Sequence, residues 1–296
     1  MPDALSRRQL LVRGGAAGAA LSLGGLVPSP RAIATYGSLG GYPFVSGVAS
    51  GDPGPDRVVL WTRLALDALG ESPLPPRRIP VAWEVADDEG MRRVRRRGMA
   101  LSSPARDHSI RVGLDGLLPG REYWYRFYAA GEASPVGRTR TAPAFGASPQ
   151  ALRLCLVSCS QFEHGYFTAY RRIVEDDPAF ILHVGDYIYE YGTDEYVAPG
   201  GNVRHHVGPE VTTLADYRRR YGQYHTDPDL LEARRLIPFI TTPDDHEVEN
   251  NYANLTSEAD HEPDQDPAIF RQRRTAAYEA YAEWMPLRDA QVRRDG

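Results

Sequence analysis

The chain has 296 residues, of which 42% are hydrophobic and 25% charged, with a formal net charge of -5. These values indicate a globular protein that is long enough for two domains. An acidic chain of this kind is not expected to hold a nucleic-acid backbone, so we expect no stable nucleic-acid complex.

The N-terminus has the composition of a targeting segment. Arg7 and Arg8 form a twin-arginine pattern, the weakly apolar run 14–27 follows, and Ala32-Ile33-Ala34 offers a cleavage site. A membrane anchor is the alternative, but the run falls short of the roughly 20 apolar residues that span a bilayer. We therefore predict a twin-arginine signal peptide over residues 1–34, export by the twin-arginine machinery to the periplasm or outside the cell, and no transmembrane anchor.

Residues 44–143 have the pattern of an antiparallel β-sandwich. Their apolar segments are short and separated by turns rich in glycine, proline and aspartate. The predicted strands are Phe44–Ala49, Arg57–Leu64, Ile79–Val85, Ser109–Leu114 and Glu122–Ala129. Residues 116–127 resemble a strand of fibronectin type III modules, in which a turn precedes a tyrosine-bearing strand. No catalytic constellation is found here, so we predict a structural or substrate-shaping domain.

A βαβ unit follows. The apolar runs 152–157 and 180–184 predict two buried parallel strands, and the spacing of apolar residues between them predicts a helix that ends at Asp177-Pro178. Because such crossovers are right-handed, we expect Cys159 and Asp186 to lie side by side at the carboxyl edge of the sheet.

The rest of the chain adds a third strand. Residues 191–211 show no periodicity and predict a long surface loop, which is typical of a lid or binding element. Tyrosines at helical spacing predict an amphipathic helix over 214–224, and a second helix over 230–236 leads into the apolar run 237–240. That run ends in Asp244-Asp245-His246-Glu247.

Three successive strand ends thus carry Cys159, Asp186 and Asp245-His246. Taken singly, they have ordinary interpretations as a core thiol, a turn and a helix cap. Together, at the edge where α/β enzymes assemble their sites, they favour a metal centre, and the thiolate favours a transition metal.

The two cysteines are not expected to form a disulfide. Cys155 and Cys159 are about 13 Å apart along one strand, whereas a disulfide requires Cα atoms within about 7 Å. We predict that Cys155 is a small core residue and that Cys159 is a free thiolate ligand.

Four motifs resemble those of a known family. They are SCSQ at 158–161, GDYIYE at 185–190, DDHEVENNY at 244–252 and AAYEAYAEWMPLR at 276–288. In wording and order they resemble alkaline phosphatase D, the PhoD-like branch of the calcineurin-like metallophosphoesterases. The resemblance implies an α+β protein of two domains, a fibronectin III- or immunoglobulin-like β-sandwich followed by an α/β metallophosphoesterase domain over 150–296. It also implies an exported phosphomonoesterase and phosphodiesterase that uses iron and calcium on phosphate ester substrates.

The same resemblance assigns roles to individual residues. Cys159, Asp186 and Tyr189 match ligands of the iron, and Asp186 bridges to calcium. Asp245 occupies the place of a metal-binding asparagine. His246 occupies the place of the catalytic histidine that stabilises the transferring phosphoryl group.

The sequence departs from the family after position 288. PhoD-like enzymes continue further and supply metal ligands from a GD-x-H motif, which does not follow His246 here. We therefore expect an incomplete metallophosphoesterase domain that binds metal weakly and turns over little substrate. Two alternatives remain open: a phospholipase or nucleotide phosphodiesterase on the same scaffold, and an inactive exported binding module.

Overall fold

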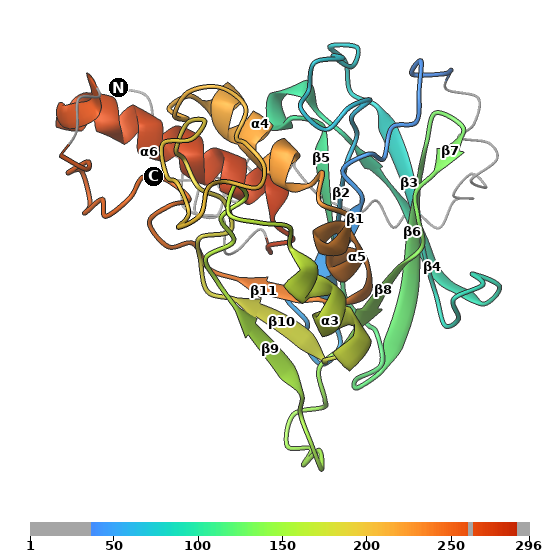
Figure 1. Ribbon diagram of the computed structural model, residues 1–296. Helices are drawn as coiled ribbons and strands as arrows, with labels where there is room; N and C mark the ends of the chain where they lie inside the picture. Colours follow the sequence, from blue (N-terminus) through green and yellow to red (C-terminus); the bar gives the residue numbers. More distant parts are fainter. Residues whose placement is uncertain (1–36, 260–262, 289–296) are drawn as a thin grey trace, which may run out of the picture.

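The computed structural model describes residues 37–259 and 263–288 as an α+β arrangement of two packed sheets and four α-helices (Figure 1). Two short 3-10 helices, η1 (Pro104–Arg106) and η2 (Pro263–Gln265), complete these elements. The predicted signal peptide lies outside the described residues. In the part of the chain that is described, no helix is both long and apolar enough to cross a membrane.

The larger sheet has six strands in the order β5-β2-β1-β11-β10-β9. Its antiparallel half consists of β1 (Val48–Gly51), β2 (Val58–Arg63) and β5 (Ser109–Leu114). Its parallel half consists of β9 (Leu154–Val157), β10 (Phe180–His183) and β11 (Phe239–Thr241). The halves join where Gly51 of β1 pairs in parallel with Phe239 of β11. One sheet therefore crosses the boundary that the sequence predicts between the two domains.

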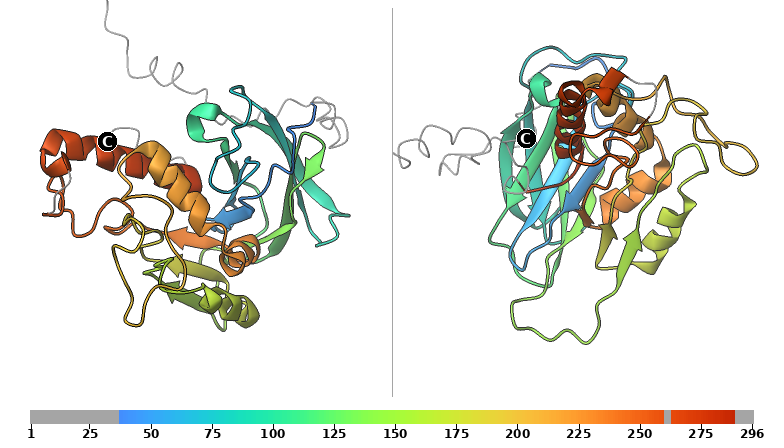
Figure 2. Two further views of the ribbon diagram at one scale, coloured as in Figure 1. Left: turned by 45° about the horizontal axis from the view of Figure 1, so that its top comes forward. Right: turned by 90° about the vertical axis from the view of Figure 1, so that its left-hand side faces the viewer.

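The smaller sheet has five strands in the order β4-β3-β6-β7, with β8 also paired to β6. Its members are β3 (Pro80–Ala86), β4 (Val94–Leu101), β6 (Glu122–Ala129), β7 (Glu132–Ala133) and β8 (Gly137–Arg140). It packs against the antiparallel half of the larger sheet, with Leu60, Trp83 and Phe127 in the shared core (Figure 2). The five strands predicted in residues 44–143 are all present within a few residues, as β1, β2, β3, β5 and β6. The strands β4, β7 and β8 were not predicted.

The helices pack on the larger sheet, over its parallel half and over β1 and β2. α3 (Thr168–Asp176) and α5 (Pro228–Leu236) lie side by side, and α4 (Leu214–Tyr224) packs on α6 (Pro267–Trp284) (Figure 1). Side-chain hydrogen bonds to the backbone fix the first turns of α4 and α6. Thr213 and Asp216 form a capping box at α4, and the Asp266 side chain accepts the backbone N–H of Ala268 at the start of α6.

The prediction that both strands of the βαβ unit are buried is wrong for β9. Leu154 and Leu156 are 45% and 64% exposed, whereas Cys155 and Val157 contact the core. Among the described strands, β9 lies at the edge of the larger sheet. One face of β9 packs on the core, and the other is open to solvent. The apolar run signalled a strand correctly, but it does not show which face is covered.

The two parts of the chain are firmly docked. The indole N–H of Trp61 in β2 donates to Glu283 O in α6 at 2.7 Å, and Arg138 Nε in β8 donates to Leu236 O at 3.1 Å. Because these bonds connect opposite ends of the sequence, they fix the sandwich relative to the helices around the strand ends.

Candidate metal centre

The ends of β9 and β10 lie side by side, as the βαβ pattern predicts. Cys159 N–H donates to Gly185 O at 3.2 Å, and Ser160 N–H donates to Asp186 O at 2.9 Å. These bonds continue the strand pairing for two residues past the sheet. Cys159 and Asp186 are therefore neighbours at its carboxyl edge.

Both residues have an unusual backbone conformation. Cys159 has φ 57° and Asp186 has φ 53°, in the left-handed region that costs a non-glycine residue roughly 1 kcal/mol or more. Gly185, between β10 and Asp186, has φ 109°, and a Cβ there would lie 2.3 Å from Asp244 Cβ. Glycine thus lets the loop after β11 approach the loop after β10.

This approach gathers three side chains, which we call the strand-end cluster: Asp186, Asp245 and His246. Each offers one ligand atom, and these atoms all lie within 4.8 Å of one another. Asp186 Oδ1 is buried and has no hydrogen-bond partner. Tyr189 Oη donates to Asp186 Oδ2 at 3.3 Å, and the Cys159 thiol lies close enough to this carboxylate to lower its pKa. The structure therefore brings all five predicted site residues together.

Cys155 and Cys159 are both free thiols, which confirms that they do not pair. Cys155 is half-buried against the core, and Cys159 is exposed at the strand-end cluster. The thiol that was predicted as a ligand is thus the one that solvent and a metal can reach.

A buried carboxylate orients His246. Glu190 is 0% exposed, and its Oε2 lies 2.8 Å from His246 Nδ1, while its Oε1 accepts the N–H of Asn250 at 2.7 Å. The Tyr189 ring stacks on the imidazole with centroids 4.0 Å apart. With Nδ1 engaged, Nε2 is the nitrogen left for the cluster or a substrate.

A second buried carboxylate, Glu247, holds the two loops together. It accepts the backbone N–H groups of Asp186 at 3.1 Å, Tyr187 at 2.5 Å and Asp244 at 2.6 Å. Sequence reasoning quoted Glu190 and Glu247 within motifs but gave neither a role. The available signal was that each glutamate follows a predicted ligand by a few residues in the same motif, a short way past a strand end.

The local charges shift three pKa values. Burial raises the pKa of Asp186, against the lowering effects of His246 and the Cys159 hydrogen bond. For His246, burial alone would lower the pKa, but the hydrogen bond and charge of Glu190 raise it above its usual value. Burial, followed by the charge of Asp186, raises the pKa of Tyr189, so this phenol keeps its proton in the absence of a cation.

The donor set fits a metal ion. Asp186 Oδ1 is a buried acceptor without a donor, and a cation there would offset the burial and the neighbouring carboxylate charges that raise the pKa of Asp186. Carboxylate oxygens suit hard cations such as calcium, whereas a thiolate, phenolate and imidazole suit a transition metal.

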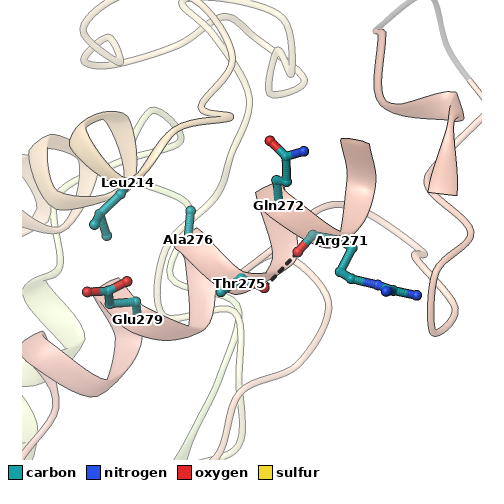
Figure 3. Close-up of a pocket in the computed structure, with 6 residues that line it drawn as sticks. All are labelled: Leu214, Arg271, Gln272, Thr275, Ala276 and Glu279. Carbon is teal, nitrogen blue, oxygen red and sulfur yellow. Dashed lines mark hydrogen bonds between the residues drawn. The ribbon is translucent and has the colours of Figure 1, made fainter. Parts of the chain in front are cut away.

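A separate hollow of about 370 Å³ lies along α6 (Figure 3). It is lined by Leu214 of α4 and by residues of α6, including Thr275 and Glu279. None of the strand-end residues lines it, and its walls hold no convergent set of ligand or nucleophilic atoms. We assign it no part in the chemistry.

Comparison with known proteins identifies the family. Residues 32–143 match the family model described as "PhoD-like phosphatase, N-terminal domain", and residues 154–296 match "PhoD-like phosphatase". The chain belongs to the PhoD-like phosphatase family. This confirms the resemblance found in the four motifs.

Two PhoD-related proteins give the scale of the similarity. The chain is 50% identical over 247 residues to "Alkaline phosphatase D" of Bacillus subtilis (strain 168), a match that covers 83% of this chain and 42% of that protein. The solved "Structure of PhoD" matches with a TM-score of 0.82 and 48% identity over 86% of this chain and 48% of that one. The chain thus spans less than half the length of each, and its fold follows that of PhoD over the matched part.

Proposed function

We propose that the chain functions as an exported metal-dependent phosphoesterase that hydrolyses phosphate monoesters and diesters. The observation that carries this proposal is the strand-end cluster, in which His246 is held by a buried glutamate beside two carboxylates. Membership of the PhoD-like family supports the same reaction class.

Specific residues would hold the metals. Cys159, Asp186 and Tyr189 supply a thiolate, a carboxylate and a phenolate, a set suited to iron, and Asp186 and Asp245 supply oxygens suited to calcium. When bound, such metals polarise the phosphoryl oxygens and supply a nucleophile near neutral pH.

The protein's own contribution centres on His246. Against the lowering effect of burial, Glu190 raises the pKa of His246, and the Nδ1–H bond to Glu190 directs Nε2 away from that carboxylate. A donor in this position meets the negative charge that develops on a phosphoryl oxygen or leaving group. Stacking of Tyr189 on the ring limits its rotation and keeps the donor aimed.

The nucleotide phosphodiesterase alternative draws support from the aromatic rings beside this histidine. The Tyr191 ring lies 5.5 Å from that of His246, and the half-exposed Tyr196 ring lies 5.5 Å from Tyr191. Such rings offer a stacking surface for a nucleobase. A preference for nucleoside diesters over p-nitrophenyl diesters would favour this alternative.

Asp186→Asn tests the proposal most directly. We expect the purified chain, supplied with iron and calcium, to hydrolyse p-nitrophenyl phosphate and bis-p-nitrophenyl phosphate slowly, and the variant to lose this turnover together with bound metal, because an amide cannot replace the ligating carboxylate. Asp244→Asn is the matched control, since it makes the same change on an exposed neighbour outside the cluster. A metal-loaded wild-type chain without turnover would favour the exported binding module instead.

Export and the type of the first domain belong to the same proposal. The twin-arginine pattern supports export, and Arg7→Lys with Arg8→Lys should leave the precursor in the cytoplasm. The fibronectin III-like assignment of 44–143 is supported by Tyr123, a buried residue of β6 whose hydroxyl accepts Leu118 N–H at 2.8 Å from the preceding turn.

A further inference from the structure

A second group of metal-ligating side chains lies where the loop between β10 and α4 meets the segment between β9 and α3. We call it the loop cluster: Glu163, Asp194 and His205. Each offers one ligand atom, and these atoms lie within 4.8 Å of one another. None of the three belongs to the strand-end cluster. The sequence predicted a lid or binding element over residues 191–211 but no particular ligand residue in it.

Glu163 is the buried member of the loop cluster. Glu163 is 0% exposed, and its Oε1 accepts the backbone N–H groups of Asp194 at 3.1 Å and His206 at 2.8 Å. Its Oε2 has no hydrogen-bond partner. The contact from Oε2 to His206 Nδ1 is 3.6 Å, which is too long for a hydrogen bond.

His206 does not complete the hydrogen bonding of Glu163. Tyr224 Oη accepts two backbone N–H groups, from Phe162 and Tyr189, so its proton is directed to His206 Nε2 at 3.2 Å. Arg220 interacts with Glu163 through its charge, but it donates to the backbone oxygens of Tyr189 and Tyr191. Glu163 Oε2 is therefore a buried acceptor that no described donor reaches, an arrangement that is costly unless a further group binds it.

The other two members are accessible from solvent. The side chains of Asp194 and His205 are 49% and 58% exposed, and His205 Nδ1 lies 2.9 Å from Asp194 Oδ1. Neighbouring ligands around a cation with bonds of about 2.1 Å are about 3 Å apart, so this pair already has the spacing of one edge of a coordination shell. A cation could thus enter from the surface and reach Glu163.

We propose that the loop cluster binds a divalent transition-metal cation, for which Zn²⁺ is the appropriate probe. Two carboxylates and one neutral imidazole balance the charge of such an ion, and the imidazole favours Zn²⁺ over Ca²⁺. The inference goes beyond the proposed function and does not depend on it, because the two clusters share no residue.

The cation would fix the loop beside the strand-end cluster. Asp194 and His205 flank Tyr196, whose ring contacts those of Tyr189 and Tyr191, and both of these rings contact His246. Binding at the loop cluster therefore stabilises the aromatic wall around His246. This role is structural, since no loop-cluster residue touches the reacting groups.

Zn²⁺ binding to paired variants tests the proposal. The Asp186→Asn chain, which lacks the strand-end metal, serves as the background, and Zn²⁺ affinity is measured by equilibrium dialysis after chelation. We expect His205→Gln to weaken binding at least about tenfold, since even indirect partners of metal ligands cost that much. His164→Gln is the matched control, because it changes a histidine of the same region whose Nε2–H donates to Tyr196 O at 3.1 Å and which lies outside the cluster. It should retain affinity within about twofold.

Trypsin gives an independent readout of the loop. Arg204 is the one lysine or arginine in residues 191–211, so cleavage between Arg204 and His205 reports on loop opening. We expect Zn²⁺ to slow this cleavage about tenfold in the background chain and not in His205→Gln or Asp194→Asn. Equal Zn²⁺ affinity in the His205 and His164 variants would overturn the site. Weakened affinity without protection from trypsin would overturn its structural role.

Discussion

The strand-end cluster and the loop cluster have the same donor set, two carboxylates and one imidazole, but they are built in opposite ways. In the strand-end cluster, sheet pairing fixes the backbone up to Asp186, and Gly185 lets the next loop approach. In the loop cluster no strand is present, and the Glu163 side chain itself holds the backbone of Asp194 and His206.

The two clusters therefore differ in whether the backbone positions the ligands or a ligand positions the backbone. At the strand ends the scaffold positions the ligands, so a ligand can be replaced while the backbone stays in place. In the loop a ligand positions the scaffold, so loss of Glu163 would release the loop as well as a donor. The strand-end cluster should therefore respond to substitution mainly in its chemistry, and the loop cluster mainly in local order.

Among the variants that should keep the metal, His246→Ala has the largest expected effect on turnover. We expect kcat to fall about a hundredfold to a thousandfold, the scale of one electrostatic donor, with bound metal retained because Asp186 and Asp245 remain. Hydrolysis of bis-p-nitrophenyl phosphate and metal analysis measure the two quantities. A variant that loses its metal would make His246 a ligand rather than a donor.

Gly185→Ala tests the scaffold of the strand-end cluster. The new Cβ would lie 2.3 Å from Asp244 Cβ, at φ 109°, so we expect the free energy of unfolding to fall by about 3 kcal/mol. Gly201→Ala is the control in the loop, since Gly201 has φ 96° but nothing within 4 Å of a Cβ, and its cost should be about 1 kcal/mol. Urea unfolding of both variants gives the comparison, and equal losses would show that the close approach to Asp244 does not matter.

Glu190→Gln tests whether Glu190 acts by positioning the His246 ring. The amide keeps the size of the side chain but removes the charge that holds the His246 imidazole, so we expect kcat to fall about tenfold with little change in KM. In a His246→Ala background the same substitution should cost less than about twofold. A full tenfold loss in that background would show that Glu190 acts independently of His246.

The last prediction concerns the acid stability of the sheet below the strand-end cluster. Burial, with the charge of Arg234, lowers the pKa of His183 in β10 to about 3, whereas the unfolded chain titrates near 6.5. Below about pH 6.5 the unfolded state therefore binds the extra proton, and the free energy of unfolding falls by about 1.4 kcal/mol per pH unit as the pH drops toward 3. His183→Gln should reduce the slope between pH 6 and 4 by this amount in urea titrations. Identical slopes would show that His183 is protonated in the folded state.

The sequence by itself determined where most of the strands lie along the chain and which residues follow the ends of β9, β10 and β11. Short apolar runs and the residues that break them are local signals, so Cys159, Asp186 and Asp245 could be placed at one edge before any coordinates were known. Three of the α-helices were likewise readable from periodicity. The family followed from four motifs, because their wording and order survive without knowledge of the fold.

Only the tertiary structure decided which segments meet across long stretches of chain. The pairing of Gly51 with Phe239 merges two expected domains into one sheet, and no local pattern encodes a partner so far away. The exposure of Leu156 depends on what covers the strand, which a period-two pattern does not state. Glu190 and Glu247 acquired roles only when the groups they bind came into view.

The loop cluster shows the same limit most clearly. Residues 191–211 lack periodicity because irregular backbone has no repeating face, so sequence predicts a loop and nothing about its contacts. Glu163 lies before the α3 crossover, and Asp194 and His205 lie after it. They converge because the right-handed βαβ unit returns the chain to the same sheet edge, where a buried carboxylate then collects the loop's N–H groups.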